Sequence, residues 1–199
     1  MRNKINILLI LIFGFFVTGL LVSGRRFVEF DLLATKSLQN IFPRFFDFPF
    51  SVFSLLGSSE IIGLLILAIA AAVYFKYQKI FWGLGAIVFI YIIELLGKFF
   101  LYHPGPPEEF FRYSIPFFFP SGGFVHTNYS FPSGHVSRTL FLVIILIFLI
   151  RKKWAYITGA LFALIMIISR VYLGEHWLSD TVGGAFLGSS IGLLAVMFL

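Results

Sequence analysis

The sequence contains no cysteine and few charged residues. The absence of cysteine excludes disulfides, thiolate nucleophiles and thiolate metal ligands. Only 12% of the 199 residues are charged, whereas 59% are hydrophobic, and the mean hydropathy is +0.98. Soluble domains carry about a quarter charged residues and roughly half apolar ones, so this composition cannot readily supply a water-exposed surface. A soluble enzyme, a coiled coil, a fibre and a disordered chain are therefore excluded.

Apolar residues fall into six runs. These cover residues 7–22, 61–75, 80–93, 139–150, 154–168 and 181–199. A helix needs ~20 mostly apolar residues to cross a bilayer, and several of these runs borrow polar residues at their ends to reach that length. We therefore predict an all-α fold, with residues 1–199 forming one integral membrane domain of six transmembrane helices.

The first and last runs have features of their own. The first follows Arg2 and Lys4, but it slightly exceeds the usual apolar core of a signal peptide and lacks a clear cleavage site. We expect it to be retained as a helix. In the last run, Gly184, Gly188 and Gly192 recur every four residues, a spacing that favours close packing against a neighbouring helix.

Basic residues near the short loops predict the orientation of the chain, because lysine and arginine there favour the cytoplasm. Those that fall on one side are Arg2, Lys4, Lys76, Lys79, Arg151, Lys152 and Lys153. We expect both termini to lie in the cytoplasm and the protein to reside in the cell membrane. Much of the net charge of +6 then reflects topology and not nucleic-acid binding. All acidic residues and all four histidines lie toward the other, extracytoplasmic side.

Two longer segments lie on that outer side. Residues 27–54 have a mixed pattern that predicts an amphipathic helix in the membrane interface, followed by a turn marked by proline. Residues 101–131 hold five of the eight prolines and an aromatic run at 117–119. We expect this second segment to form a lid or a loop that dips into the membrane.

Polar residues gather at the outer ends of four predicted helices. Lys98 ends the third helix, 132–135 (Pro-Ser-Gly-His) opens the fourth, Ser169 and Arg170 end the fifth, and His176 and Asp180 open the sixth. Ionisable groups deep in a membrane cost about 2.5 to 3.5 kcal/mol each, so their presence needs a reason. Because successive spans alternate in direction, all four groups reach one face and form a single candidate site.

The residue types at this site suit a phosphate. Lys98 and Arg170 supply positive charge, and arginine can grip two phosphate oxygens at once. Ser133 and Gly134 stand at a helix N-terminus, where unpaired N–H groups and the helix dipole favour an anion. The four residues together predict an anion-binding pocket.

The two histidines suit phosphoryl transfer. His176 and Asp180 lie one helical turn apart, so the carboxylate can orient the imidazole as a nucleophile. His135 can protonate a leaving oxygen and later activate water. This scheme needs no metal or other cofactor. A metal site at these three residues is the alternative, but no short ligand spacing such as His-x-x-x-His occurs. Each residue alone also has a plainer interpretation, for example Lys98 as an interfacial lysine paired with Glu94.

At these positions the sequence resembles the type 2 phosphatidic acid phosphatase superfamily, whose soluble relatives include vanadium haloperoxidases. Two of the three family motifs match fully: Pro-Ser-Gly-His at 132–135, and Ser-Arg-x5-His-x3-Asp at 169–180. The resemblance implies a six-helix fold in which His176 is the phosphorylated nucleophile, Asp180 its partner and His135 the acid and base. It also implies that the phosphate is held by Lys98, Ser133, Gly134 and Arg170.

The first family motif, Lys-x6-Arg-Pro, departs from its pattern here. Lys98 is followed at the arginine position by Gly105, so one phosphate-binding guanidinium is missing. We hypothesise that Arg138 replaces it, because Arg138 lies three residues after His135 on roughly the same helical face. Arg112 and His103 are weaker candidates.

The expected activity is metal-independent hydrolysis of a lipid phosphate or diphosphate, through a phosphohistidine, at the extracytoplasmic face. Polyprenyl diphosphate (such as undecaprenyl diphosphate), phosphatidic acid and phosphatidylglycerol phosphate all fit, and the sequence does not choose among them or define an oligomeric state. A phosphotransferase would use the same residues. A non-catalytic lipid-phosphate binder would not need both histidines, and a transporter would place charges across both halves of the membrane.

Overall fold

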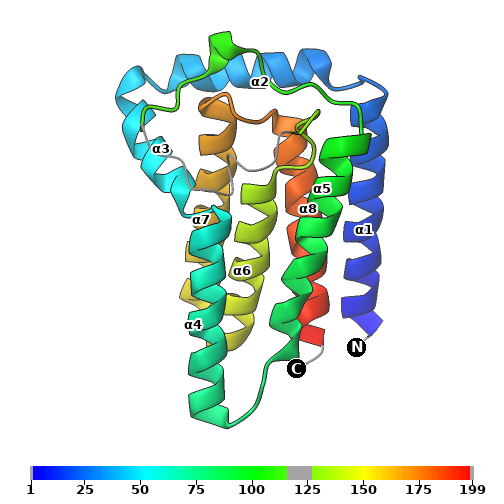
Figure 1. Ribbon diagram of the computed structural model, residues 1–199, viewed down its shortest axis with the longest axis vertical. Coiled ribbons are helices and arrows are strands. Elements are labelled where there is room, and N and C mark those ends of the chain that lie inside the picture. The colour runs from blue at the N-terminus through cyan, green and yellow to red at the C-terminus, as the bar shows by residue number, and fades with distance from the viewer. Residues whose placement is uncertain (1, 116–126, 198–199) are drawn as a thin grey trace.

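The computed structural model describes residues 2–115 and 127–197, and within them the regular elements are all helices. Long helices run side by side in a bundle, and α2 (Val28–Ile41) lies across one end of it (Figure 1). The predicted all-α class is confirmed. The aromatic run 117–119, predicted to be part of a lid, lies outside the described residues.

Five described segments are long and apolar enough to cross a membrane. They are α1 (Arg2–Ser23), α4 (Ser59–Tyr77), the stretch Trp82–Phe100, α7 (Lys153–Tyr172) and α8 (Leu178–Met197). A sixth apolar helix, α6 (Gly134–Ile150), has 17 residues, which is at the short end of the range for a span. The count of six spans stays a prediction.

Two helices extend beyond their apolar runs at the end where the polar residues gather. The third run forms a short 3-10 helix, η2 (Trp82–Ala86), followed by α5 (Ile87–Phe100), and therefore continues past residue 93. It can do so because Glu94 and Lys98, one turn apart, form an ion pair at 2.7 Å. The fourth helix begins at Gly134, within the motif at 132–135 that was predicted to open it, so His135 and Arg138 lie within the helix ahead of the apolar run.

The segment between the first two spans contains two helices. The amphipathic helix predicted within residues 27–54 is α2, and its chain turns at Pro43 into η1 (Arg44–Phe46). A second helix, α3 (Asp47–Leu55), follows and was not predicted. Its Pro49 stands in the first helical turn, where a proline removes no helical hydrogen bond.

Helix α8 packs closely against α6 through the predicted glycine stripe. A Cβ at Gly184 would stand 2.6 Å from the Ser133 carbonyl oxygen, and one at Gly188 would stand 2.1 Å from the Ser137 carbonyl oxygen. A Cβ at Gly192 would stand 3.3 Å from the Phe141 carbonyl oxygen, a tight contact but not a prohibitive one. At Gly184 and Gly188 a side chain would block the approach, which agrees with the predicted packing role.

The directions of the helices bring the ends of four helices together. The C-terminal ends of α5 and α7 and the N-terminal ends of α6 and α8 lie beneath α2, whereas both ends of the described chain lie at the opposite end of the bundle (Figure 1). The backbone joins these ends directly, since the Ser133 N–H donates to the Asp180 carbonyl at 3.0 Å.

Candidate active site

A tight turn between α7 and α8 positions His176. Gly174 adopts a left-handed conformation (φ +68°), and a Cβ there would stand 2.2 Å from the Phe110 carbonyl oxygen, so both the backbone angle and the space require glycine. The Arg170 carbonyl accepts the N–H groups of Glu175 and His176 at 3.2 and 3.3 Å. The turn thus holds His176 beside the end of α7.

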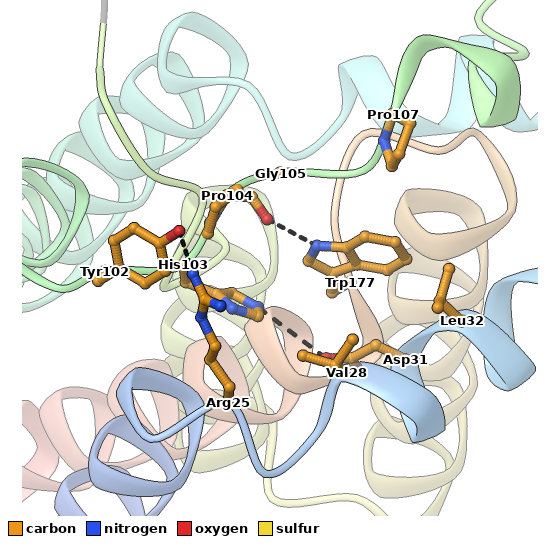
Figure 2. Close-up of a pocket in the computed structure, with 10 residues that line it drawn as sticks. All are labelled: Arg25, Val28, Asp31, Leu32, Tyr102, His103, Pro104, Gly105, Pro107 and Trp177. Atoms are coloured by element: carbon orange, nitrogen blue, oxygen red, sulfur yellow. Dashed lines mark hydrogen bonds and ion pairs between the residues drawn. The ribbon is translucent and has the colours of Figure 1, made fainter.

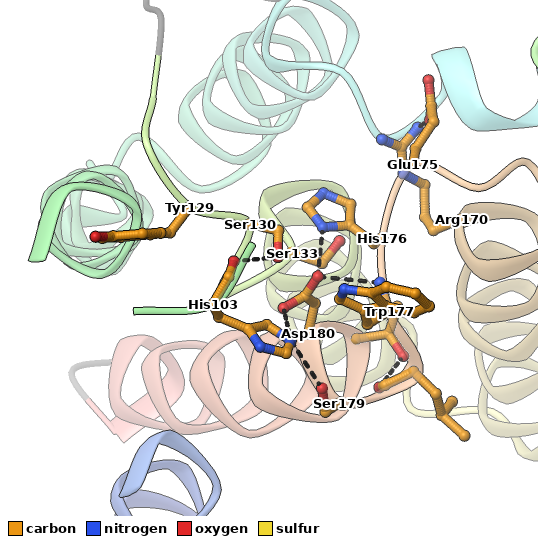
Figure 3. A network of polar contacts seen from close by, with 12 residues as sticks. His103, Tyr129, Ser130, Ser133, Arg170, Glu175, His176, Trp177, Ser179 and Asp180 are labelled. Atoms are coloured by element: carbon orange, nitrogen blue, oxygen red, sulfur yellow. Dashed lines mark hydrogen bonds and ion pairs between the residues drawn. The ribbon is translucent and has the colours of Figure 1, made fainter. Parts of the chain in front are cut away.

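Asp180 binds the histidine and caps its own helix. Its Oδ2 lies 3.1 Å from His176 Nδ1 and accepts the Trp177 N–H at 3.0 Å. Because Trp177 immediately precedes α8, this second bond satisfies an N–H that the helix leaves unpaired, as in a capping box. One carboxylate therefore fixes both the helix start and the imidazole (Figure 3).

Three residues behind Asp180 support it, and the sequence interpretation did not assign them to this task. Asp31 of α2 accepts the Ser179 N–H at 2.8 Å and the Ser179 hydroxyl at 2.7 Å. His103 Nε2 lies 3.3 Å from Asp180 Oδ1 and 3.2 Å from Ser179 Oγ. The pattern of apolar residues along the sequence does not predict these contacts, because they join segments that are far apart in the chain.

Burial shifts the pKa values of Asp31 and His103 in opposite directions. It raises the pKa of Asp31 from 3.8 to about 6, although the hydrogen bonds from Ser179 oppose the rise. It lowers the pKa of His103, an effect that Asp180 opposes. The His103 ring shares a hydrogen bond with the Ser179 hydroxyl and lies 3.3 Å from Asp180 Oδ1, so the two histidines flank one aspartate.

His176 is buried in a positively charged environment. Burial lowers its pKa well below 6.5, and the charges of Arg170 and Lys98 lower it further. Arg170 donates to Ser54 Oγ of α3 at 2.5 Å and pairs with Glu175. The His176 imidazole is therefore neutral at neutral pH, which is the form a nucleophile needs.

Lys98 and Arg138 share one carboxylate. Lys98 Nζ lies 2.7 Å from Glu94 Oε1, and Arg138 Nη1 lies 2.7 Å from Glu94 Oε2. Arg138 also donates to the Gly57 carbonyl at 3.3 Å and lies over the Tyr91 ring. Arg138, the hypothesised replacement for the missing guanidinium, is therefore linked to Lys98 through Glu94, which the sequence interpretation treated only as a partner of the lysine.

The N-terminus of α6 lies beside Glu94, which binds both Lys98 and Arg138. Ser133 is fully buried, and its Oγ has no hydrogen-bond partner among residues 2–115 and 127–197. A Cβ on Gly134 would stand 2.1 Å from Glu94 Oε1. His135 lies close enough to Arg170, Arg138, His176 and Lys98 for their charges to act on it. All eight predicted site residues thus meet at one end of the bundle.

The two weaker candidates lie elsewhere. Arg112 donates to the Gln39 carbonyl at 3.3 Å and the Tyr172 hydroxyl at 3.2 Å, so it fastens the outer loop to α2 and α7. His103 faces Asp180 and not the cluster of cations. Of the three proposed replacements for the missing guanidinium, only Arg138 joins Lys98.

Gly105 lines a separate pocket of about 350 Å³ on the outer side of Asp31 and His103 (Figure 2). Arg25 enters it, donating to the Tyr102 hydroxyl at 2.5 Å and lying over that ring. The Trp177 indole closes one wall by donating to the Pro104 carbonyl at 2.8 Å. Gly105, which stands where the family pattern has arginine, therefore lines a pocket that contains the guanidinium of Arg25, from the turn between α1 and α2.

Fold and site together define a class: a helical membrane protein with a buried histidine–aspartate pair and three cations at one end of its apolar helices. The PAP2 superfamily model matches residues 62–199, which is most of the chain and includes every predicted site residue. The protein therefore belongs to the PAP2 superfamily.

Known proteins similar to this chain are phosphatases. Phosphatidylglycerophosphatase B of Bacillus subtilis is 34% identical over 143 residues, covering 67% of this chain and 65% of that protein. Undecaprenyl-diphosphatase of Sulfolobus acidocaldarius is 41% identical over 70 residues, covering 35% of this chain and 34% of that protein. The chain thus spans between about a third and two thirds of the length of these curated relatives.

Solved structures share the fold. A transmembrane PAP2 type phosphatidylglycerolphosphate phosphatase from Bacillus subtilis superposes with a TM-score of 0.78 at 23% identity, covering 100% of this chain and 96% of that one. Aquifex aeolicus LpxE gives 0.64 at 23% identity, with coverage of 83% and 94%. This chain therefore has the same fold as these two structures. Figure 1 shows its helix arrangement.

Proposed function

We propose that this protein hydrolyses a phosphate or diphosphate group of a membrane lipid through a phosphohistidine at His176. The observation that carries the proposal is the His176–Asp180 pair, 3.1 Å apart, buried beside Arg170, Lys98 and Arg138. Membership of the PAP2 superfamily supports it, since the similar proteins are named as phosphatases.

In the first step, His176 attacks the phosphorus. Asp180 occupies Nδ1, so Nε2 forms the new bond while the bond from phosphorus to the lipid oxygen breaks. His135 donates a proton to that leaving oxygen. Asp180 stabilises the positive charge that develops on the His176 ring.

In the second step, water attacks the phosphohistidine. His135, now neutral, takes a proton from the water, a P–O bond forms and the Nε2–P bond breaks. Inorganic phosphate leaves and His176 returns to its neutral form. Each proton and bond is thus assigned to a residue of this chain, and the scheme uses no metal ion.

The cations stabilise the transferred group. Lys98, Arg138 and Arg170, together with the N–H groups at the start of α6, would face the equatorial oxygens of the phosphoryl group. The unpaired Ser133 hydroxyl, which is buried, would donate to one of them. Arg138 thereby takes the part of the guanidinium that Gly105 cannot supply.

The same proposal places the site at the outer face of a six-span protein. α6 would be the sixth span, α2 would lie in the interface, and both chain ends would be cytoplasmic. Support comes from Lys4, Lys76 and Arg151, which lie toward the end of the bundle opposite the site, as cytoplasmic lysine and arginine do.

A lipid is the substrate class that this position favours. The site lies at the end of the apolar helices, which in a bilayer would bring it to the depth of the lipid headgroups. The names of the similar proteins point the same way, since they refer to undecaprenyl diphosphate, phosphatidylglycerophosphate and, in Bacteroides thetaiotaomicron, the 4'-phosphate of lipid A.

The test is phosphate release from a panel of lipid phosphates by detergent-purified protein in the presence of a chelator. Wild type is expected to release phosphate from at least one lipid, and His176→Ala to release none. The matched control is Lys36→Ala in α2, outside the site. Release that survives His176→Ala, or loss of release in chelator, would overturn the proposal.

A further inference from the structure

Glu94 holds two of the cations that the proposed mechanism gives to the substrate. Its two carboxylate oxygens lie 2.7 Å from Lys98 Nζ and 2.7 Å from Arg138 Nη1. Glu94 and Arg138 are both buried, so solvent hardly screens this bridge. A carboxylate with one oxygen on each of two cations makes the contacts that two phosphate oxygens would make.

The carboxylate also occupies the start of α6. Its atoms stand 2.1 to 2.3 Å from the point where Gly134 would carry a Cβ, so it lies directly against the first helical residue. The first N–H groups of a helix have no intrahelical acceptor and attract anions. The neighbouring Ser133 hydroxyl is buried without a hydrogen-bond partner in the described part of the chain, and it remains a donor for a further oxygen.

We infer that Glu94 is an internal anion that occupies part of the phosphate site and competes with the substrate phosphate for Lys98 and Arg138. This inference rests on the proposed function. Lys98, Arg138 and Glu94 together carry a net charge of one, whereas the two cations alone carry two. A phosphate that enters beside the bridged carboxylate meets like charge at short range, so binding requires Glu94 to leave one or both cations.

The consequence is a limit on phosphate affinity. Competition weakens the binding of the inorganic phosphate left after hydrolysis, which the two cations would otherwise retain. A lipid phosphate gains further contacts through its apolar part, so it can displace Glu94 where free phosphate does so poorly. Glu94 thus lowers the affinity of the site for free and lipid-attached phosphate alike, and the apolar contacts of the lipid offset that loss.

The test measures binding of inorganic phosphate by calorimetry to the full chain in detergent. Glu94→Gln removes the charge and is expected to lower the Kd by about tenfold, within the usual range of coupling between two ligands of one site. Glu94→Asp keeps the charge, but its shorter side chain cannot span both cations, and we expect a smaller decrease. Glu109→Gln, an exposed position in η3 (Glu108–Phe110), removes the same charge away from the site and should leave the Kd unchanged.

The outcomes separate the two proposals. A Kd that is unchanged or raised in both Glu94 variants overturns the inference and makes Glu94 a structural link between Lys98 and Arg138. If neither the wild type nor the Glu94 variants bind phosphate, the phosphate site itself is overturned, and with it the proposed function. A Kd lowered equally by Glu109→Gln also overturns the inference, because it assigns the effect to overall charge.

Discussion

Arg138 and Arg112 carry the same charge on the outer side of the molecule, but they have different surroundings. Arg138 reaches the carboxylate that Lys98 also binds, whereas Arg112 is occupied by the Gln39 carbonyl and the Tyr172 hydroxyl. Only Arg138 is therefore placed to stabilise charge on a transferred phosphoryl group. We propose that Arg138 compensates for Gly105 from a distant segment of the chain, because a guanidinium is needed at a point in space and not at a position in the sequence.

We predict that Arg138→Ala lowers kcat/KM for lipid phosphate by about 10²- to 10³-fold, the usual loss when one donor to a developing oxyanion is removed. Arg112→Ala should change kcat/KM by only a few-fold, because it loosens a loop. Steady-state kinetics with both purified variants checks this. If only Arg112→Ala abolishes turnover, the assignment of Arg138 is wrong.

The pH dependence of activity tests the environment of His176. Burial, then Arg170, lowers the pKa of this imidazole well below 6.5. A lowered pKa means that the nucleophile stays neutral as the pH falls from 7 through 6.5. We therefore expect protonation of His176 to leave kcat/KM for a lipid phosphate unchanged between pH 7 and 6.5. It should decrease kcat/KM only at lower pH. An acid limb centred above pH 6.5 that is assigned to His176 would contradict this.

At the scale of elements, α8 is held against α6 by glycines, and this contact sets the register of the site. The Ser133 N–H meets the Asp180 carbonyl only while the two helices stay close. A side chain at Gly188 would strike the Ser137 carbonyl and push α8 outward. His176 and Asp180, at the start of α8, would then separate from the N-terminus of α6, where the phosphate is proposed to bind.

We therefore expect Gly188→Ala to destabilise the protein by about 1 to 3 kcal/mol, as overpacking does, and to reduce activity. Gly63→Ala in α4 is the matched control, since no atom lies within 4 Å of its Cβ position. That change should be neutral or should stabilise by up to about 1 kcal/mol, the helix propensity difference. Thermal unfolding in detergent compares them, and equal effects of the two substitutions would refute the packing argument.

The sequence was sufficient to predict which helix ends meet, because the alternation of apolar runs and the motifs at 132–135 and 169–180 depend on local pattern alone. It was not sufficient for Asp31, which caps α8 from α2, or for the second cation on Glu94. These contacts join segments whose relative placement depends on how α2 crosses the bundle. The helix ends within the site agree with the prediction, since α5 passes Lys98 and ends at Phe100, and α6 begins at Gly134.

For the whole molecule, the proposed orientation can be tested directly, because the chain has no cysteine of its own. Single cysteines at Glu109→Cys in η3 and Lys153→Cys at the start of α7 mark opposite ends of the bundle. We expect a membrane-impermeant maleimide added to intact cells to label residue 109 and not residue 153. The reverse pattern would place the site in the cytoplasm, and equal labelling before permeabilisation would refute a single orientation.

The central claim is that a phosphoryl group passes through His176. The most direct measurement is rapid acid-free quenching of the protein mixed with ³²P-labelled lipid phosphate, followed by peptide mapping of the bound label. The account predicts label on His176 in wild type and none in His176→Ala. Turnover by wild type with no label on His176 at any time, or with label on another residue, would contradict it.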